Sequence, residues 1–182
     1  MKAFAVIGTS AIGKAPFVTR LIEAYRRDGH AVSVIKHGPD GLDIDTPGKA
    51  SFTRREAGAR EVMLVGDQRL VIMSEYGFEP QPPLEALMER LDPVDLVIVE
   101  GYHDTVLPTI EVYRPGPQRR PRYLENRHVV AVVSDAPLPI ALPSFGLDDI
   151  EAIADFMAMK IGLARQRRFA GRIHAAAGAA GV

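Results

Sequence analysis

A glycine-rich loop follows a short apolar run near the start of the chain. Residues 3–7 have the length of a buried strand, and residues 8–14 then read Gly-Thr-Ser-Ala-Ile-Gly-Lys. Apolar residues next recur at helical spacing as far as Tyr25. A strand, a loop ending in Gly-Lys and a helix form the phosphate cradle of P-loop proteins, in which backbone N–H groups and the lysine charge face a polyphosphate. This feature predicts an α/β fold with a nucleotide site.

Two residues after the lysine depart from the standard loop. Ala15 stands where a Ser or Thr hydroxyl normally binds Mg²⁺, and Pro16 lacks the N–H that the first helical turn offers to a phosphate. Each lost charge-assisted hydrogen bond costs about 1.5–3 kcal/mol. Proline is tolerated at a helix start, so the fold is expected to persist while nucleotide binding weakens.

The rest of the chain alternates strand-like and helical patterns, as in an α/β protein. Within the run 95–100, the residues between Asp95 and the final acid Glu100 are continuously apolar, which suits a central parallel strand covered on both faces. We predict a three-layer, P-loop NTPase-like fold with a mostly parallel central sheet and a β-hairpin extension around Gly66. Further strands are expected at 31–35, 109–113 and 129–133, the hairpin strands at 61–65 and 69–74, and helices at 49–57, 84–91 and 150–161.

The C-terminal part suggests a helix start and then a tail. Asp148 with Glu151 three places later resembles a capping box. Beyond residue 162 the chain is basic, beginning with Arg165, and then almost entirely Ala and Gly. We therefore expect one domain over residues 1–162 and a partly disordered tail over residues 163–182.

Composition excludes several classes of function. The net charge of −1 gives no electrostatic reason to expect a nucleic-acid partner. The absence of cysteine excludes disulfides and thiolate metal sites. No apolar stretch approaches the ~20 residues of a membrane helix, and the N-terminus does not look like a signal peptide. We expect a cytoplasmic protein without membrane association.

Four acidic residues are candidates for a nucleotide site. Glu100 ends the apolar strand 95–100, where P-loop proteins carry an acid that reaches magnesium, although a solvated strand-end acid is the alternative. Asp43 or Asp45, in the loop after the second strand, is expected to take over part of the metal role lost at Ala15, unless the loop is simply solvated. Asp135 follows a strand and offers acceptors to guanine N1–H and its amino group, but a turn-forming aspartate accounts for it nearly as well.

Several segments taken together resemble the molybdopterin-guanine dinucleotide biosynthesis protein B (MobB) family. The resemblance extends from about residue 1 to residue 161. The segments Asp-Ile-Asp-Thr-Pro-Gly-Lys at 43–49 and Arg-Glu-Ala-Gly-Ala at 55–59 are far more specific than the phosphate loop. Residues 34–37, 95–102 and 134–138 also carry the likeness.

The resemblance implies a dimeric, GTP-binding accessory protein of the guanylyltransferase that joins GMP to molybdopterin. By position it implies Mg²⁺ near Asp45 and Glu100, and the guanine base near Asp135. It implies that Gly13 and Lys14 hold the phosphates. The other loop residues that we expect at the cofactor are Gly8, Thr9, Ser10 and Ala15. The family's usual Gly-Thr-Gly-Lys-Thr-Thr is replaced by residues 11–16 of this chain, so we expect weak or no GTP hydrolysis and assign no catalytic residue.

Three functions remain open from the sequence. The first is a MobB-like accessory protein that binds guanine nucleotide, favoured by Lys14, Glu100 and Asp135. The second is a non-catalytic adaptor on a degenerate P-loop fold that no longer binds nucleotide, favoured by Ala15 and Pro16. The third is a small-molecule kinase with an arginine-bearing lid at residues 114–122, but that segment is rich in proline and is better interpreted as a surface loop.

Overall fold

The computed structural model describes residues 1–8, 14–38, 44–116 and 120–165. These residues fall into two compact units, one within Met1–Lys36 and Pro93–Val182 and the other within His37–Asp92. The expectation of one domain over 1–162 with a tail over 163–182 stays a prediction, and residues 166–182 lie outside the described ranges. None of the helices in these ranges is long and apolar enough to cross a membrane.

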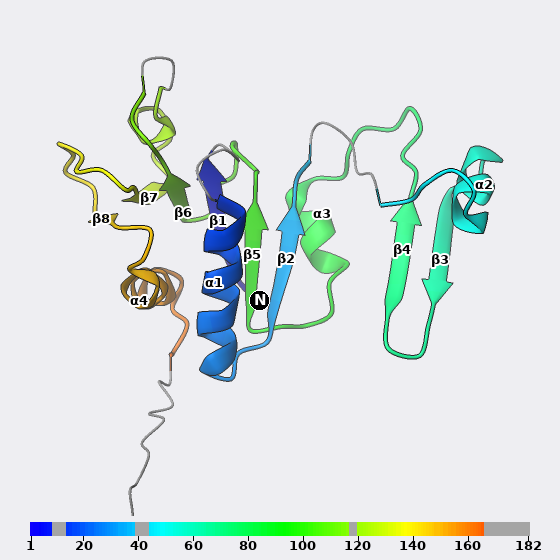
Figure 1. Cartoon of the computed structure of the whole chain (residues 1–182), viewed down its shortest axis with the longest axis horizontal. Helices are drawn as coiled ribbons and strands as arrows, with labels where there is room; N and C mark the ends of the chain where they lie inside the picture. The colour runs from blue at the N-terminus through cyan, green and yellow to red at the C-terminus, as the bar shows by residue number, and fades with distance from the viewer. Residues whose placement is uncertain (9–13, 39–43, 117–119, 166–182) are drawn as a thin grey trace, which may run out of the picture. The chain divides into compact units, whose positions relative to one another are not determined.

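A parallel sheet forms the centre of the first unit (Figure 1). Its strands are β1 (Lys2–Gly8), β2 (Val32–Lys36), β5 (Leu96–Glu100), β6 (Thr109–Val112), β7 (Val129–Val133) and β8 (Ser144–Phe145). They lie in the order β2-β5-β1-β6-β7-β8, and each neighbouring pair is parallel. This arrangement confirms the predicted α/β fold with a parallel central sheet.

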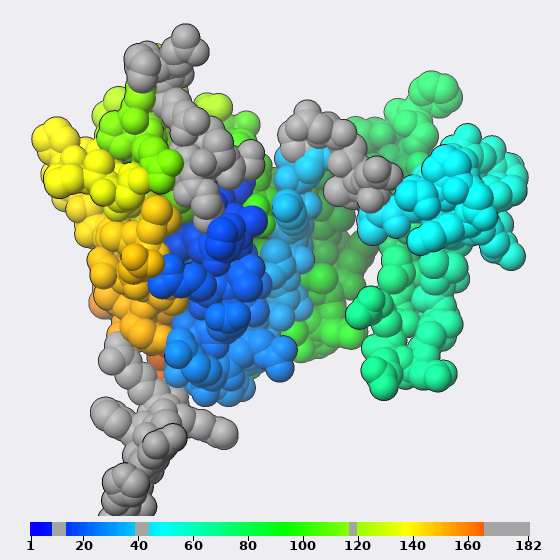
Figure 2. All heavy atoms as spheres, viewed as in Figure 1, coloured from blue at the N-terminus to red at the C-terminus, as the bar shows by residue number. Residues whose placement is uncertain are grey.

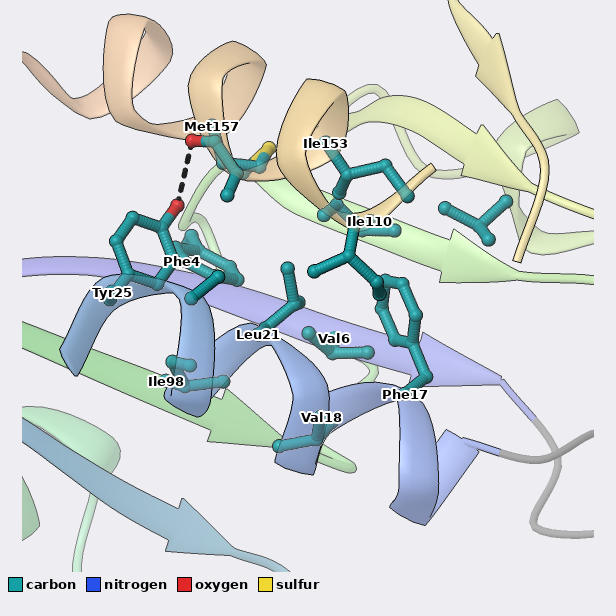
Figure 3. Packing of buried hydrophobic residues seen from close by; sticks show 14 of the residues in the cluster. Phe4, Val6, Phe17, Val18, Leu21, Tyr25, Ile98, Ile110, Ile153 and Met157 are labelled. Atoms are coloured by element: carbon teal, nitrogen blue, oxygen red, sulfur yellow. Dashed lines mark hydrogen bonds between the residues drawn. The ribbon is translucent and has the colours of Figure 1, made fainter. Parts of the chain in front are cut away.

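Two helices cover one face of this sheet. They are α1 (Lys14–Arg27) and α4 (Ile150–Ile161), which lie against each other in Figure 2. The helical spacing of apolar residues in α1 places one stripe of side chains toward the strands. Tyr25 also donates a hydrogen bond from its hydroxyl to the Ala154 carbonyl at 2.9 Å, which ties α1 to α4. The buried cluster in Figure 3 includes Phe4, Val6, Phe17, Leu21, Ile98, Ile110, Ile153 and Met157.

The opposite face at β6 and β7 is covered by coil and by a short 3-10 helix, η2 (Arg122–Leu124). Glu111 lies on β6 and is 3% exposed, and its carboxylate accepts the backbone N–H groups of Arg122 and Tyr123 at 2.8 and 2.7 Å. Burial raises the pKa of Glu111, while these hydrogen bonds oppose the rise. This buried acid therefore fastens η2 to the sheet.

The predicted capping box at the start of α4 is wrong. The residue before the helix is Asp149, and its side chain makes no capping hydrogen bond. Asp148 instead accepts a hydrogen bond from Arg20 on α1 at 2.8 Å, and Glu151 pairs with Arg27 at 2.5 Å. Because arginines of the neighbouring helix reach both acids, the local capping arrangement does not form.

The second unit contains the predicted hairpin. Its strands are β3 (Glu61–Val65) and β4 (Leu70–Ser74), which pair antiparallel. The backbone N–H of Gly66 bonds to the carbonyl of Arg69 at 2.9 Å and closes the turn. Two short helices, α2 (Ala50–Glu56) and α3 (Leu84–Glu89), lie within the helices predicted at 49–57 and 84–91.

Candidate functional site

Predicted site residues lie at one edge of the parallel sheet. The strand register pairs Val6 with Glu100, Gly8 with Val112, and Val112 with Val133. The carboxyl ends of β1, β5, β6 and β7 therefore share an edge. Ligands of open parallel α/β sheets bind outside the carboxyl ends of the strands. This edge is the candidate site of the first unit.

Gly8 ends β1 in a conformation that favours glycine. Its φ is +133°, and a Cβ built there lies 2.3 Å from the backbone carbonyl oxygen of Val112 on β6. A side chain at this position would push β1 and β6 apart, because the oxygen belongs to the backbone of a paired strand. The first glycine of the predicted phosphate loop is therefore required by the packing of the sheet itself.

Lys14 begins α1, and its side chain reaches back to the ends of β1 and β5. The Nζ atom donates a hydrogen bond to the carbonyl oxygen of Gly8 at 3.1 Å and lies 3.7 Å from Oε1 of Glu100. The side chains of Lys14 and Glu100 are only 12% and 8% exposed. The structure thus brings three predicted residues together: a turn glycine, a lysine charge suited to phosphate and an acid suited to a magnesium-bound water.

The start of α1 is suited to an anion but lacks the magnesium hydroxyl. Its first turn carries no acidic residue, so the positive end of the helix dipole is not neutralised from within. Ala15 is exposed there, and the nearby hydroxyl of Thr19 donates back to the Ala15 carbonyl at 3.1 Å. The predicted loop residues Thr9, Ser10 and Gly13 lie outside the described ranges.

The described ranges contain few ligands for Mg²⁺. Within them no three His, Asp or Glu side chains gather into a group that could hold a metal ion. Glu100 offers one carboxylate, which faces Lys14, and Ala15 offers no hydroxyl. Mg²⁺ keeps several waters and is commonly bound through one or two carboxylates plus substrate phosphates. Among the described residues of this edge, Glu100 is therefore the candidate that could reach such an ion.

Asp135 follows β7, and an arginine engages its carboxylate. Arg114, which comes soon after β6, donates from Nε to Oδ2 of Asp135 at 2.7 Å, and its Nη2 lies 2.5 Å from the same oxygen. The hydrogen bond from Arg114 and its charge hold the pKa of Asp135 below the ordinary value, against the effect of desolvation. Ser134 accepts the Ala136 N–H at 3.1 Å and fixes the turn. Asp135 is thus an oriented, ionised carboxylate.

Asp45 belongs to the second unit and is buried in a network there. Ser51 donates from Oγ to Oδ1 of Asp45 at 2.9 Å, and Arg55 donates from Nε to Oδ2 at 3.0 Å. Desolvation would raise the pKa of Asp45, but hydrogen bonds from Arg55, Ser51 and the Thr46 backbone, together with the charge of Arg55, lower it on balance. Arg55 also bonds to Glu75 at 2.6 Å. Both oxygens of Asp45 thus accept hydrogen bonds, and its contact with Mg²⁺ stays a prediction.

Two arginines of these networks were not recognised as site residues from the sequence. Arg55 lies in the segment 55–59, and its bond to Asp45 joins that segment to 43–49. The proline-rich sequence of residues 114–122 favours a surface loop for Arg114. The available signal was that Arg114 and Asp135 each follow a predicted strand, but the sequence did not reveal that those strands are neighbours. Asp43 lies outside the described ranges.

Known proteins of similar sequence cover most of the chain. The family model for molybdopterin guanine dinucleotide synthesis protein B matches residues 3–135. The molybdopterin-guanine dinucleotide biosynthesis adapter protein of Escherichia coli (strain K12) is 36% identical over 151 residues, which span 81% of this chain and 86% of that protein. The protein of the same name from Haemophilus influenzae is 34% identical over 155 residues, or 84% and 85% of the two chains.

Solved structures share the fold. The crystal structure of a molybdopterin-guanine biosynthesis protein B matches with a TM-score of 0.69 and 27% identity, over 87% of this chain and 99% of its own. The structure of Bacillus subtilis MobB matches with a TM-score of 0.69 and 20% identity, over 88% and 98% of the two chains. The second likeness concerns the fold alone.

Proposed function

This chain belongs to the family of molybdopterin guanine dinucleotide synthesis protein B, and we propose that it is an adapter of that biosynthesis which binds guanine nucleotide. One observation carries the proposal. Lys14, at the N-terminus of α1, holds its ammonium group 3.1 Å from the Gly8 carbonyl and 3.7 Å from Glu100. This is the position from which a P-loop lysine reaches nucleotide phosphates.

Asp135 is proposed to select the base. An ionised carboxylate accepts hydrogen bonds from guanine N1–H and the 2-amino group, whereas adenine has no N1–H to offer. The lowered pKa of Asp135 keeps this group ionised at neutral pH. Guanine selectivity is therefore expected of any nucleotide bound at this edge.

Hydrolysis of the bound nucleotide is proposed to be weak or absent. Phosphoryl transfer depends on a metal ion that neutralises charge on the phosphates. Ala15 provides no hydroxyl for that ion, and the Glu100 carboxylate already faces Lys14. The nucleotide would act as a bound ligand rather than as a rapidly consumed substrate.

We expect micromolar binding of GTP and GDP, and weaker binding of ATP, in calorimetric titrations with and without Mg²⁺. The Lys14→Ala substitution is expected to weaken GTP binding by about 10- to 100-fold, because a charge-assisted bond to phosphate contributes about 1.5–3 kcal/mol. Lys160→Ala provides a matched control, since this exposed lysine lies in the last turn of α4. It is expected to bind GTP as the unmodified protein does.

The same titration discriminates the second candidate function, an adaptor that no longer binds nucleotide. Ala15 and Pro16 favour that alternative, because they remove a hydroxyl and an N–H from the phosphate cradle. An unmodified protein that binds no nucleotide up to millimolar concentration would contradict the nucleotide proposal and support the adaptor. Equal affinity of the Lys14→Ala variant would contradict the role of Lys14.

An adapter acts on a protein partner, which we propose is the guanylyltransferase that joins GMP to molybdopterin. The relatives from E. coli and H. influenzae are named adapter proteins of this biosynthesis. A guanine nucleotide bound at an exposed sheet edge would be accessible to such an enzyme.

We further propose that the hairpin mediates a homodimer. The register pairs Met63 with Ile72 and Val65 with Leu70, so these four apolar side chains share one face. Each of them is at least half exposed, from 50% for Ile72 to 76% for Val65. A contiguous apolar face and a sheet of only two strands are both unfavourable in water. A second hairpin packed on this face would cover these apolar side chains and support a two-stranded sheet that is marginally stable alone.

The unmodified protein is therefore expected to have about twice the 19.8 kDa mass of the chain in multi-angle light scattering. The Ile72→Asp substitution is expected to shift it to monomer, because a carboxylate would be buried against apolar partners. Met159→Lys serves as the control, since Met159 is 68% exposed on α4. A monomeric unmodified protein, or a dimer that Ile72→Asp leaves intact, would contradict the proposal.

A further inference from the structure

We propose that Arg114 is a specificity-determining positioning residue, which orients the Asp135 carboxylate for the guanine edge. The inference rests on the proposed function, because it concerns the same nucleotide site. Arg114 donates to Asp135 across the ends of two adjacent parallel strands, β6 and β7. Its role is to act through Asp135 rather than to contact phosphate.

Guanine sets a strict requirement on its acceptor. The N1–H and 2-amino groups are two parallel donors, so the carboxylate must be ionised and must face them in a fixed orientation. An aspartate after a strand end can rotate about its side-chain torsions, and ordering it costs conformational entropy. A residue that holds the carboxylate in place before the nucleotide arrives reduces that cost.

The geometry of the pair meets this requirement. Nε and Nη2 of Arg114 both approach Oδ2 of Asp135, at 2.7 and 2.5 Å. Both nitrogens of Arg114 engage Oδ2, so Arg114 leaves Oδ1 to other donors. The pair fixes the orientation of the carboxylate without using all of its acceptor capacity.

The sheet also fixes the two backbones from which the pair extends. The backbone N–H of Tyr113 donates to the Val133 carbonyl at 2.8 Å. The backbone N–H of Ser134 donates to the Phe145 carbonyl at 2.9 Å. The ring of Tyr113 packs edge-on against Tyr123, with centroids 5.8 Å apart. Arg114 therefore leaves the sheet from a position held by a strand and by an aromatic pair.

Both side chains are accessible, at 48% for Arg114 and 39% for Asp135. Ion pairs at such exposure contribute little to stability. A structural role in folding therefore gives a poor account of this contact, while a ligand can still reach the free side of the carboxylate. Loss of Arg114 is expected to leave a folded protein whose selectivity can be measured.

The experiment compares GTP with ITP, whose base lacks the 2-amino group, by calorimetric titration, with ATP as the reference nucleotide. The unmodified protein is expected to prefer GTP over ITP by about tenfold or more, since one hydrogen bond to a charged acceptor distinguishes them. In Arg114→Ala this preference is expected to fall to about twofold, while ATP affinity is unchanged. Arg114→Lys is expected to restore part of the preference, because an ammonium group retains one charged donor.

Two further variants separate this role from others. Arg120→Ala removes an exposed arginine of the same connection, which pairs with Glu125 at 3.0 Å, and is expected to keep the full preference. In an Asp135→Asn background, Arg114→Ala is expected to change the GTP-to-ITP ratio no further, because the arginine acts through the carboxylate.

Three results would overturn the inference. An unchanged ratio in Arg114→Ala would show that Asp135 needs no positioning, while GTP binding itself would stand. Tighter GTP binding in that variant would show that Arg114 occupies the place of the base. An unmodified protein that binds neither GTP nor ITP would overturn the inference together with the nucleotide site.

Discussion

Replacing Gly8 with alanine is expected to lower the free energy of unfolding by about 3 kcal/mol or more. The backbone at Gly8 has a φ of +133°, and such a conformation strains a residue with a Cβ by about 1–3 kcal/mol. The added atom would also lie 2.3 Å from the carbonyl oxygen of Val112, so β1 and β6 would have to separate. Urea unfolding followed by circular dichroism measures the loss, and Tm is expected to fall by about 6–12 °C.

A matched glycine separates the two costs. Gly29 has a φ of +92°, but a Cβ built there has no atom within 4 Å. Gly29→Ala therefore carries the conformational cost alone, about 1–2 kcal/mol. The difference between the two losses in free energy of unfolding measures the steric clash with the Val112 carbonyl. Equal losses would show that the sheet accommodates the extra atom and would contradict the packing argument.

The same substitution links the fold to the site. The carbonyl oxygen of Gly8 accepts the hydrogen bond from Lys14 Nζ at 3.1 Å. A shift of β1 away from β6 would therefore move the acceptor that positions the lysine. Any folded fraction of Gly8→Ala is expected to bind GTP more weakly than the unmodified protein, in proportion to that displacement.

Strand positions could be predicted because apolar runs report burial directly. The runs at 3–7 and 95–100 became β1 and β5, and the five residues Leu96–Glu100 are all buried. Strand order could not be predicted, because it depends on pairs far apart in the chain, such as Lys2 with Leu96. Local periodicity carries no information about which strands are neighbours.

Residues of the site could be predicted where the motif itself determines their position. Gly8 and Lys14 flank one loop. Glu100 ends β5, which runs parallel to β1, so Glu100 lies at the same edge of the sheet. Arg114 could not be assigned in this way, because its partner Asp135 lies on a different strand. A long charged side chain can form an ion pair with a residue on another helix or strand. The sequence shows the charges of both residues but not that they are close in space.

Arg165 is a second residue whose contacts could not be predicted from the sequence. The sequence suggested that it opens a basic tail, but the structure places it at 4% exposure among three acids. Its guanidinium bonds to Asp28 at 2.5 Å, to Asp155 at 2.7 Å and to Glu151 at 2.9 Å. It also lies over the ring of Tyr25, 5.3 Å from the centroid. One side chain thus connects the end of α1 with α4.

The Arg165→Ala substitution is expected to lower the free energy of unfolding by about 3–5 kcal/mol. Removing one partner of a buried ion pair leaves an uncompensated charge, here the Asp28 carboxylate at 8% exposure. The stacking of the guanidinium on Tyr25 is lost as well. Urea unfolding at neutral pH measures the change. Arg165→Lys is expected to lose about half as much, because it keeps the charge but cannot reach three acids at once.

Arg120→Ala is the matched control for this prediction. Arg120 is 76% exposed and pairs with a single acid, Glu125, at 3.0 Å. Exposed pairs of this kind contribute about 0–1 kcal/mol. A loss at Arg165 no larger than the loss at Arg120 would show that water reaches the three carboxylates and that α1 and α4 are held by their apolar faces alone. A large loss at Arg165 that Arg165→Lys fully repairs would assign the effect to charge, and the three-way geometry of the guanidinium would then be dispensable.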